Sequence, residues 1–205
     1  QNWLKKFPTA RALANAPLGD VLRAWQGLGY NRRAKMLHAA AKSLTPFPKS
    51  AEELQKLPGI GPYTARAVMT FAHNSDEVFI ETNIRTAVTH HFFPRQKTVD
   101  DREVLAVLEK AHPRGKAREW YAALMDYGAY LKRSGVRLNA KAKGYAKQKT
   151  FAGSDRQARG AILKELAKAP AAKSRLLNLL GDDRRQQLEA QLAKLLAEGM
   201  VTRKG

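Results

Sequence analysis

Residues 57–65 read Leu57-Pro-Gly-Ile-Gly-Pro-Tyr-Thr-Ala65, and this stretch decides the fold. Glycine lacks a Cβ atom, so its backbone can turn tightly and approach a ligand closely. The N-terminus of a helix that starts at Pro62 would also favour an anion such as phosphate. Two interpretations fit, an ordinary turn between helices or a hairpin that grips a phosphate backbone. The Leu-Pro before the glycines and the apolar helix after them favour the second, a helix-hairpin-helix clamp on DNA.

Helical patterns surround this hairpin along the chain. Apolar residues recur at helical spacing, and capping residues or glycines stand at the ends of the runs. Ser50, for example, opens a capping box with Glu53. The predicted helices are residues 9–14, 18–28, 31–43, 50–56, 62–73, 83–91, 100–111, 116–133, 154–168, 173–180 and 183–198. Only Val78–Ile80 resembles a strand before residue 199, so the predicted fold class is all-α.

The part of the chain beyond Phe151 has a pattern of its own. Three predicted helices are followed by an extended segment that begins Gly199-Met-Val-Thr202. This order is typical of a winged-helix module, and a plain three-helix bundle fits it as well. The last helix carries a stripe of leucines, which suits packing or dimerisation as well as contact with DNA. We therefore expect three domains, over residues 1–90, 91–150 and 151–205.

The composition excludes several classes of protein. The chain has 205 residues, 37 Lys plus Arg against 18 Asp plus Glu, a formal net charge of +19 and no cysteine. The absence of cysteine excludes disulfides, thiolate zinc sites and iron–sulfur clusters. No apolar run approaches the roughly 18 residues of a membrane span, and no signal peptide opens the chain, so we expect a cytoplasmic protein. The positive charge indicates a polyanionic partner, most simply nucleic acid.

The charge is concentrated in residues 131–150. This segment carries seven basic side chains and no acidic one, among them Lys141 and Lys143. It can be a solvated linker between domains, or it can follow phosphates along a nucleic acid with a salt-dependent affinity. The two interpretations are compatible.

A second informative stretch is Val78-Phe-Ile-Glu-Thr-Asn-Ile-Arg-Thr86. Glu81 comes directly after an apolar run, at the start of a predicted helix, so its carboxylate should be partly desolvated. Such a group can stabilise positive charge that develops on a sugar, or attack it. It can equally act only as the cap of the helix, where a negative charge is favourable. The residues alone leave both roles open.

Taken together, these stretches resemble a known family. Residues from Phe7 to about Gln148 are similar, in order and with few gaps, to the helix-hairpin-helix (HhH-GPD) DNA glycosylase superfamily, and within it to the adenine glycosylase branch. The matching stretches are FPTARALANAPLGDVLRAWQGLGYNRRAKMLHAAA, LPGIGPYTARAVMTFA, FIETNIRTAV and ALMDYGAYL. The resemblance implies two helical lobes, a hairpin on the DNA backbone and a target nucleotide flipped into a pocket.

The resemblance also implies roles for single residues. The family's catalytic aspartate falls on Glu81, which would stabilise an oxocarbenium-like state at C1′, and Asn83 matches the asparagine of the family's D-G-N motif. Tyr63 stands where relatives that also cleave the strand carry an imine-forming lysine, so a monofunctional glycosylase is implied. Tyr30 matches a residue that wedges into the base stack. The expected DNA-binding residues are Gly59, Gly61, Pro62, Thr64, Gln26, Gly29, Tyr30, Arg32, Lys141 and Lys143.

Four features depart from the family pattern. The catalytic carboxylate is Glu81, one methylene longer than aspartate. The region where the family has its cluster-binding cysteines reads Leu131-Lys-Arg-Ser-Gly-Val-Arg137, which excludes the iron–sulfur cluster. The family's first core helix, with the glutamate that protonates adenine, has no counterpart after Gln1. The family domain that reads 8-oxoguanine is replaced by the winged-helix-like module. Because Asn2-Trp-Leu-Lys-Lys6 looks like the middle of a helix, we expect a fragment of a longer protein.

The sequence thus predicts a DNA base-excision repair glycosylase that removes adenine opposite guanine or 8-oxoguanine. Two alternatives are a thymine or uracil mismatch glycosylase and a non-catalytic DNA-binding relative. The expected partner is double-stranded DNA with a mismatch or lesion, and the expected state is a monomer associated with the nucleoid, without contact to a membrane. No cofactor is expected, apart from a monovalent cation, Na⁺ or K⁺, that the backbone carbonyls around Leu57 and Ile60 could hold.

Overall fold

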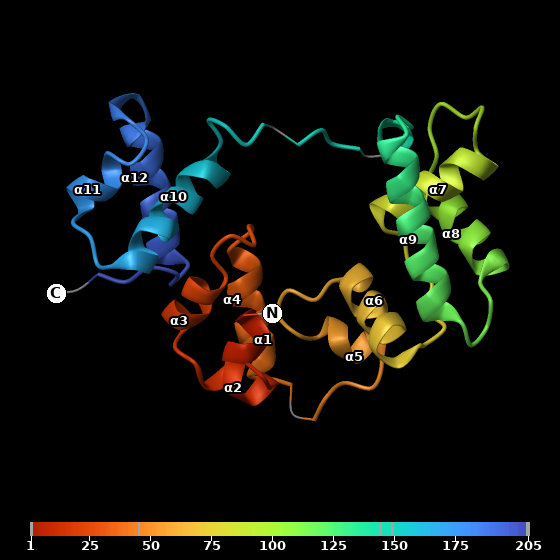
Figure 1. Cartoon of the computed structure of the whole chain (residues 1–205), viewed down its shortest axis with the longest axis horizontal. Helices are drawn as coiled ribbons and strands as arrows, with labels where there is room; N and C mark the ends of the chain where they lie inside the picture. The colour runs from red at the N-terminus through yellow and green to blue at the C-terminus, as the bar shows by residue number, and fades with distance from the viewer. Residues whose placement is uncertain (1, 45, 144, 149, 204–205) are drawn as a thin grey trace. The chain divides into compact units, whose positions relative to one another are not determined.

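The chain folds into two compact units of helices. The computed structural model describes residues 2–44, 46–143, 145–148 and 150–203 (Figure 1). Unit 1 comprises Gln1–Phe47, Leu57–Gly59 and Gln148–Gly205, and unit 2 comprises Pro48–Lys56 and Ile60–Lys147. Among the described residues there is no strand, only an isolated bridge between Val99 and Ala142. The predicted all-α class is confirmed.

The observed helices lie close to the sequence-based ranges. They are α1 Asn2–Lys6, α2 Ala10–Asn15, α3 Leu18–Ala24, α4 Arg32–Ala41, α5 Ala51–Gln55, α6 Pro62–His73, α7 Thr82–Phe92, α8 Asp101–Ala111, α9 Ala117–Arg133, α10 Asp155–Lys168, α11 Lys173–Leu177 and α12 Arg185–Ala197, with short 3₁₀ turns at Asn139–Lys141 and Asp182–Arg184. Two differences are larger than the rest: α1 is absent from the predicted ranges, and α3 ends at Ala24 instead of residue 28. It stops early because Gly27 (φ 89°) and Gly29 (φ 71°) take left-handed backbone conformations that interrupt a helix.

Side-chain caps start several of these helices as the sequence predicts. The Thr9 hydroxyl accepts a hydrogen bond from the Ala12 N–H at 3.1 Å, and the Ser50 hydroxyl accepts one from the Glu53 N–H at 3.2 Å. The Glu53 carboxylate reaches back to the Lys49 N–H at 2.7 Å. Each cap satisfies N–H groups that have no partner inside the helix.

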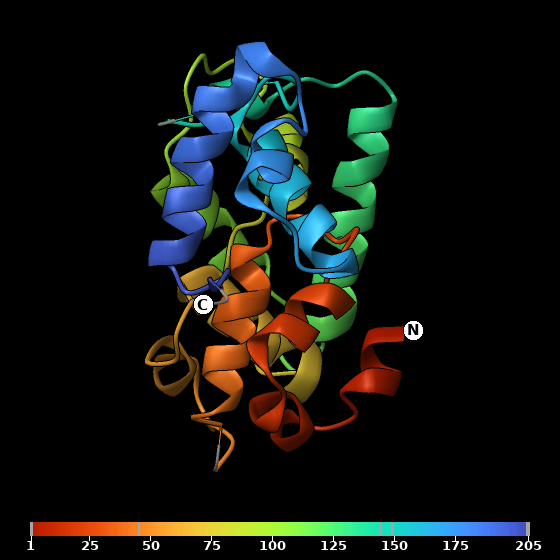
Figure 2. The same ribbon diagram turned by 90° about the vertical axis from the view of Figure 1, so that its left-hand side faces the viewer.

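In unit 1 the helices at both ends of the chain share one core. Buried residues of α2 to α4, such as Val21 and Ala34, pack in the same cluster as Ile162 of α10 and Leu188 and Leu195 of α12. Figures 1 and 2 both show α10 and α12 side by side. Residues 151–205 therefore do not form a separate domain as the sequence-based boundaries expected. They bury their apolar faces against the N-terminal helices.

The terminal β element of the expected winged-helix-like module is also not seen. Gly199 ends α12 with φ 66°, and the Met200 N–H donates to the Leu195 carbonyl at 3.0 Å. The Met200 side chain then turns into the core, 6% exposed. Since residues 199–203 find no strand partner, the described part of this segment is turn and coil rather than a wing.

In unit 2, helices α7, α8 and α9 enclose a second core (Figure 1). Its fully buried members include Ile84, Val104, Leu108 and Tyr121. The strand-like run Val78–Ile80 is not a strand. It is an extended segment that leads from α6 into α7, and no neighbouring strand is available to pair with it among the described residues.

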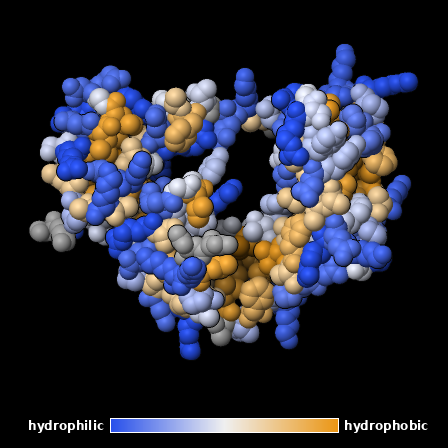
Figure 3. Space-filling model, viewed as in Figure 1, coloured by the Kyte–Doolittle hydropathy of each residue, from blue (hydrophilic) through white to orange (hydrophobic). Residues whose placement is uncertain are grey.

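Hydrophilic side chains cover much of the visible surface of both units (Figure 3). In the described part of the chain, no helix combines the length and the apolar character that a membrane span requires.

Candidate active site and nucleic-acid interface

Glu81 caps the N-terminus of α7. Its backbone is extended, and its Oε2 accepts a hydrogen bond from the Asn83 N–H at 2.6 Å. The side chain is half-buried. The predicted capping role is thus confirmed, and it does not exclude a chemical role, because one carboxylate oxygen is sufficient for the cap.

Two contacts hold the segment that carries Glu81. The Phe79 ring stacks on the buried Tyr121 ring of α9 with centroids 4.1 Å apart, and the Phe79 N–H donates to the Tyr121 hydroxyl at 3.1 Å. The Arg66 guanidinium of α6 donates to the Val78 carbonyl at 2.7 Å. Burial raises the pKa of Tyr121, so this phenol stays neutral. The segment before Glu81 is therefore fixed by both α6 and α9.

Helix α9 approaches the first turn of α7 closely at Gly128. A Cβ atom at this position would lie 2.0 Å from the Asn83 carbonyl oxygen, so only glycine fits here. One turn further along α9, the Lys132 ammonium donates to Asn83 Oδ1 at 2.7 Å. Burial lowers the pKa of Lys132, and the nearby Glu81 carboxylate opposes this shift. Glu81, Asn83 and Lys132 thus form one polar cluster at the start of α7.

Tyr63 lies in the first turn of α6 and is 44% exposed. The edge of its ring faces Phe79, with centroids 5.7 Å apart. Tyr63 therefore packs against the segment that carries Glu81, two residues before the carboxylate. A phenol in this place can contact a substrate but cannot form an imine.

The loop between α5 and α6 has the backbone geometry expected of the hairpin. Gly59 has φ 76°, and a Cβ atom there would lie 2.4 Å from Cβ of Met36. Gly61 precedes α6 as its N-cap, no side chain caps this end, and a Cβ atom at Gly61 would meet open space. Pro62 is the first helical residue, as its missing N–H favours. Contacts of Gly61, Pro62 and Thr64 with DNA, and the cation at Leu57 and Ile60, stay predictions.

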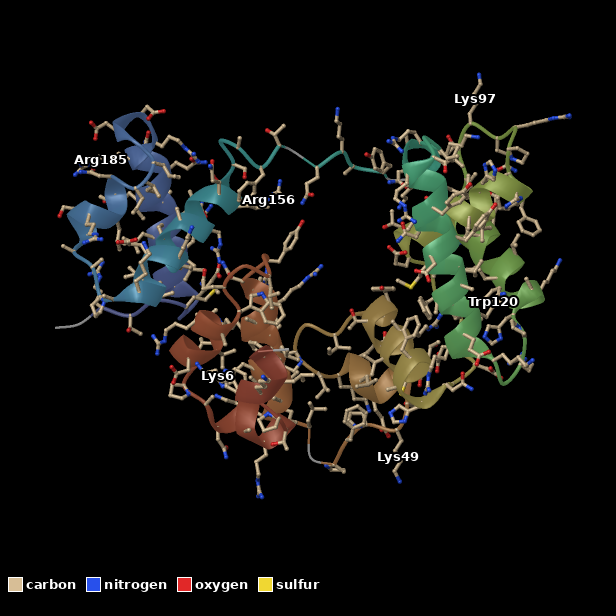
Figure 4. All side chains as sticks on the ribbon, in the orientation of Figure 1. Lys6, Lys49, Lys97, Trp120, Arg156 and Arg185 are labelled. Atoms are coloured by element: carbon tan, nitrogen blue, oxygen red, sulfur yellow. The ribbon has the colours of Figure 1, made fainter. Side chains whose placement is uncertain are left out.

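The turn after α3 displays Tyr30 in a left-handed conformation. Its φ is 46°, unusual for a residue with a side chain, and the residue is 54% exposed. The Trp25 indole N–H donates to the Gly29 carbonyl at 2.7 Å, which braces the turn. A hydrogen bond from Gln148 lowers the pKa of Tyr30, with help from the guanidinium groups of Arg156 and Arg33. Arg156, labelled in Figure 4, belongs to the first turn of α10.

Two other residues expected to bind DNA lie near this turn in unit 1. The Gln26 side-chain amide donates to the Leu22 carbonyl at 3.3 Å, within its own helical segment, so it is turned back toward α3. Arg32 is exposed at the start of α4. The structure therefore leaves Arg32 accessible to a phosphate, whereas Gln26 already has a protein partner.

Comparison with known proteins agrees with this geometry. The helix-hairpin-helix motif of known families matches residues 47–71. An adenine DNA glycosylase of Mycolicibacterium smegmatis is 34% identical over 224 aligned residues, which cover 97% of this chain and 75% of the relative. One of Mycobacterium tuberculosis H37Rv is 35% identical over 231 residues, covering 98% and 75%. This chain belongs to the adenine DNA glycosylase family. The human member is 36% identical over 88 residues, 40% of this chain and 16% of its own length.

The 205 residues contain no cysteine, so they supply no thiolate ligand for an iron–sulfur cluster. The basic segment, residues 131–150, makes contacts within the protein. Lys132 bonds Asn83, and the Lys141 ammonium donates to the Pro94 carbonyl at 2.9 Å. Lys143 pairs with Asp100 at 3.2 Å. Part of the basic segment therefore stabilises unit 2. Neither a solvated linker nor a phosphate-binding segment, the two interpretations from the sequence, included this structural role.

The basic side chains of this segment, including those with protein contacts, also predict a salt-dependent contact with DNA. Replacing Lys141, Lys143 and Lys147 with glutamine should weaken binding to every DNA sequence alike. The slope of log affinity against log salt concentration should flatten by about 0.9 for each lost phosphate contact. Fluorescence anisotropy with a labelled duplex at several salt concentrations measures this slope. Lys149, in the same segment, lies outside the described residues.

The control for this prediction is Lys168→Gln on α10, which removes one positive charge outside the segment, from a lysine paired with Glu165 at 2.9 Å. An unchanged slope in the triple variant would assign these lysines to structure and solvation alone. Thermal unfolding of both variants shows whether the folded state is retained.

The sequence pattern did not predict that Lys132, Gly128 and Tyr121 are parts of the site. Lys132 was one of seven basic residues in its segment, and nothing in the sequence pairs it with Asn83, 49 residues earlier. Gly128 did carry a signal, because an isolated glycine inside a predicted helix indicates a close packing contact.

Proposed function

We propose that this chain is an adenine-specific DNA N-glycosylase of base-excision repair. Its substrate would be adenine mispaired with guanine or 8-oxoguanine in double-stranded DNA. The observation that carries this proposal is the 34–35% identity to proteins named adenine DNA glycosylase over 97–98% of the chain. The helix-hairpin-helix match at residues 47–71 and the net charge of +19 support DNA as the partner.

In the proposed reaction the bond between the base and C1′ of the sugar breaks, and the bonding electrons leave with the base. The Glu81 carboxylate stabilises the positive charge that develops at C1′. Water then adds to this carbon, and the proton that the water loses balances the negative charge of the released base. The half-buried position of Glu81 supports this role, because a carboxylate acts more strongly on a nearby charge where water is partly excluded.

The proposed activity is monofunctional. Cleavage of the strand through an imine requires a free primary amine. The phenol of Tyr63 cannot supply one, and the Lys132 ammonium, in the polar cluster with Glu81, is held by Asn83. Release of the base without a break in the strand is therefore the expected product. We also propose that the protein is a monomer and is located at the nucleoid.

The experiment that tests the proposal is a panel of duplexes, each with one mispair: A·G, A·8-oxoguanine, T·G or U·G. The chain is incubated with each duplex, and abasic sites are revealed by alkali, with a parallel sample left untreated. We expect breaks at adenine after alkali and an intact strand without it.

The other outcomes separate the alternatives. Excision from T·G or U·G but not from A·G would replace the adenine assignment with a thymine or uracil glycosylase. Binding to the duplexes without excision from any of them would make the chain a non-catalytic DNA-binding relative. Breaks in the untreated sample would contradict the monofunctional assignment.

A further inference from the structure

Lys132 occupies an unusual position for a lysine. It lies in the last turn of α9, it is half-buried, and among the described residues its ammonium forms no ion pair with a carboxylate. Its bond is instead to the neutral Asn83 carboxamide, with 2.7 Å between Nζ and Oδ1. Taking an ammonium partly out of water without a carboxylate partner is unfavourable. If the contact served only to pack α9 against α7, an apolar side chain would suffice.

The chemistry of this bond fixes the orientation of Asn83. A lysine ammonium has three N–H donors and no acceptor, whereas a carboxamide has one acceptor oxygen and one donor –NH₂ group. The oxygen of Asn83 must therefore face Lys132, and the –NH₂ group is turned away from it. Without Lys132 the two ends of the carboxamide could exchange places.

Further hydrogen bonds hold both Lys132 and Asn83 in place. The Arg137 guanidinium donates to the Lys132 carbonyl, which fixes the end of α9. The Asn83 backbone N–H donates to Glu81 Oε2 at 2.6 Å, so the residue that Lys132 orients is also the residue that positions the proposed catalytic carboxylate. Gly128 lets α9 come close enough to α7 for the lysine to reach.

We infer that Lys132 is a positioning residue for base excision, which holds the Asn83 carboxamide so that its N–H donors face an oxygen of the nucleotide placed at Glu81. This inference rests on the proposed function and adds a residue to it. Lys132 acts through Asn83 and need not touch the substrate itself.

The test compares Lys132→Met, which removes the donor but keeps the length, with Lys132→Arg, which keeps donors. Excision of adenine is followed in a single turnover with enzyme in excess, and duplex affinity is measured separately. We expect Lys132→Met to slow excision by about 10- to 100-fold, since a misplaced group near the reacting atom costs up to this much. Duplex affinity and the Lys132→Arg rate should stay near the unmodified values.

Two further readouts distinguish positioning from support of the fold. In an Asn83→Ala background, Lys132→Met should cause no additional loss, because the lysine then has nothing to orient. At alkaline pH the excision rate of the unmodified chain should fall as the Lys132 ammonium loses its proton, below the range of an ordinary lysine. In Lys132→Arg this fall should be absent, since a guanidinium stays charged. The charged group that acts on the Lys132 ammonium is Glu81, and Arg137 bonds only the Lys132 backbone carbonyl.

Lys110→Met, an exposed change on α8, is the matched control. The inference is overturned if Lys132→Met excises as fast as the unmodified chain, or if its loss persists in the Asn83→Ala background. The Asn83 side-chain amide signal in ¹⁵N NMR gives a readout besides activity. In the unmodified chain the two Asn83 side-chain N–H protons should be protected from exchange with water. In Lys132→Met the carboxamide should change orientation freely, so that its signal is averaged. If no duplex is cut at all, the proposed function fails, and this signal still decides whether Lys132 orients Asn83.

Discussion

Replacing Glu81 with glutamine is expected to abolish base excision while duplex binding stays nearly intact. Glutamine has almost the same shape, and its amide oxygen can still accept the Asn83 N–H that Glu81 Oε2 now accepts at 2.6 Å. The variant therefore keeps the cap of α7 and removes only the negative charge. We expect the single-turnover rate to fall by at least about 100-fold, as for other groups that stabilise charge in a transition state.

Two companion variants make this prediction sharp. Glu81→Ala removes cap and charge together, so it should also lose about 1 kcal/mol of stability, which Glu81→Gln retains. Glu81→Asp shortens the side chain by one methylene and shows how strictly the reaction needs the length of glutamate. Excision by Glu81→Gln within about tenfold of the unmodified rate would reduce Glu81 to a helix cap.

Replacing Gly128 with alanine is expected to have the second largest effect. The new Cβ atom would lie 2.0 Å from the Asn83 carbonyl oxygen and 2.5 Å from its carbonyl carbon, so α9 and the first turn of α7 must move apart. Forcing an extra methyl group into a packed contact costs about 1–3 kcal/mol. A shift of the Glu81 and Asn83 backbone by about 1 Å would reduce excision by about 100-fold.

Urea denaturation and single-turnover excision measure the two effects of Gly128→Ala. The matched control is Gly160→Ala on α10, where a Cβ atom meets nothing within 4 Å. A helical glycine in open space should gain up to about 1 kcal/mol when it becomes alanine, so the same substitution has the opposite sign there. Equal stability of the two variants would contradict the close approach of α9 to α7.

The sequence predicted the helices well because the signals that begin and end them are local. The hydroxyls of Thr9 and Ser50 cap the helices that follow them. The end of α3 was predicted too late, because the glycines after Trp25 interrupt the helix before residue 28. Val78–Ile80 resembles a strand in sequence but is too short to build a sheet, and an apolar run needs a neighbouring strand to become one. Here the run packs on Tyr121 instead.

The position of residues 151–205 could not be predicted from local patterns. The leucines of α12 form an apolar stripe. The stripe predicts that this face is buried, but it does not identify the surface against which it packs. The structure places Leu188 and Leu195 in one core with the N-terminal helices. Arg159 of α10 pairs with Glu198 at 2.7 Å, and Lys35 of α4 donates to the Glu198 carbonyl.

The sequence by itself determined the all-α class, the hairpin at residues 57–65 and the carboxylate at the start of α7, because each depends on neighbouring residues and on backbone freedom at glycine. Only the tertiary structure decided what surrounds that carboxylate. Tyr121, Gly128 and Lys132 come from a helix that begins 36 positions after Glu81 in the chain. Their contacts arise from the packing of α9 on α7, which depends on how whole helical faces fit together.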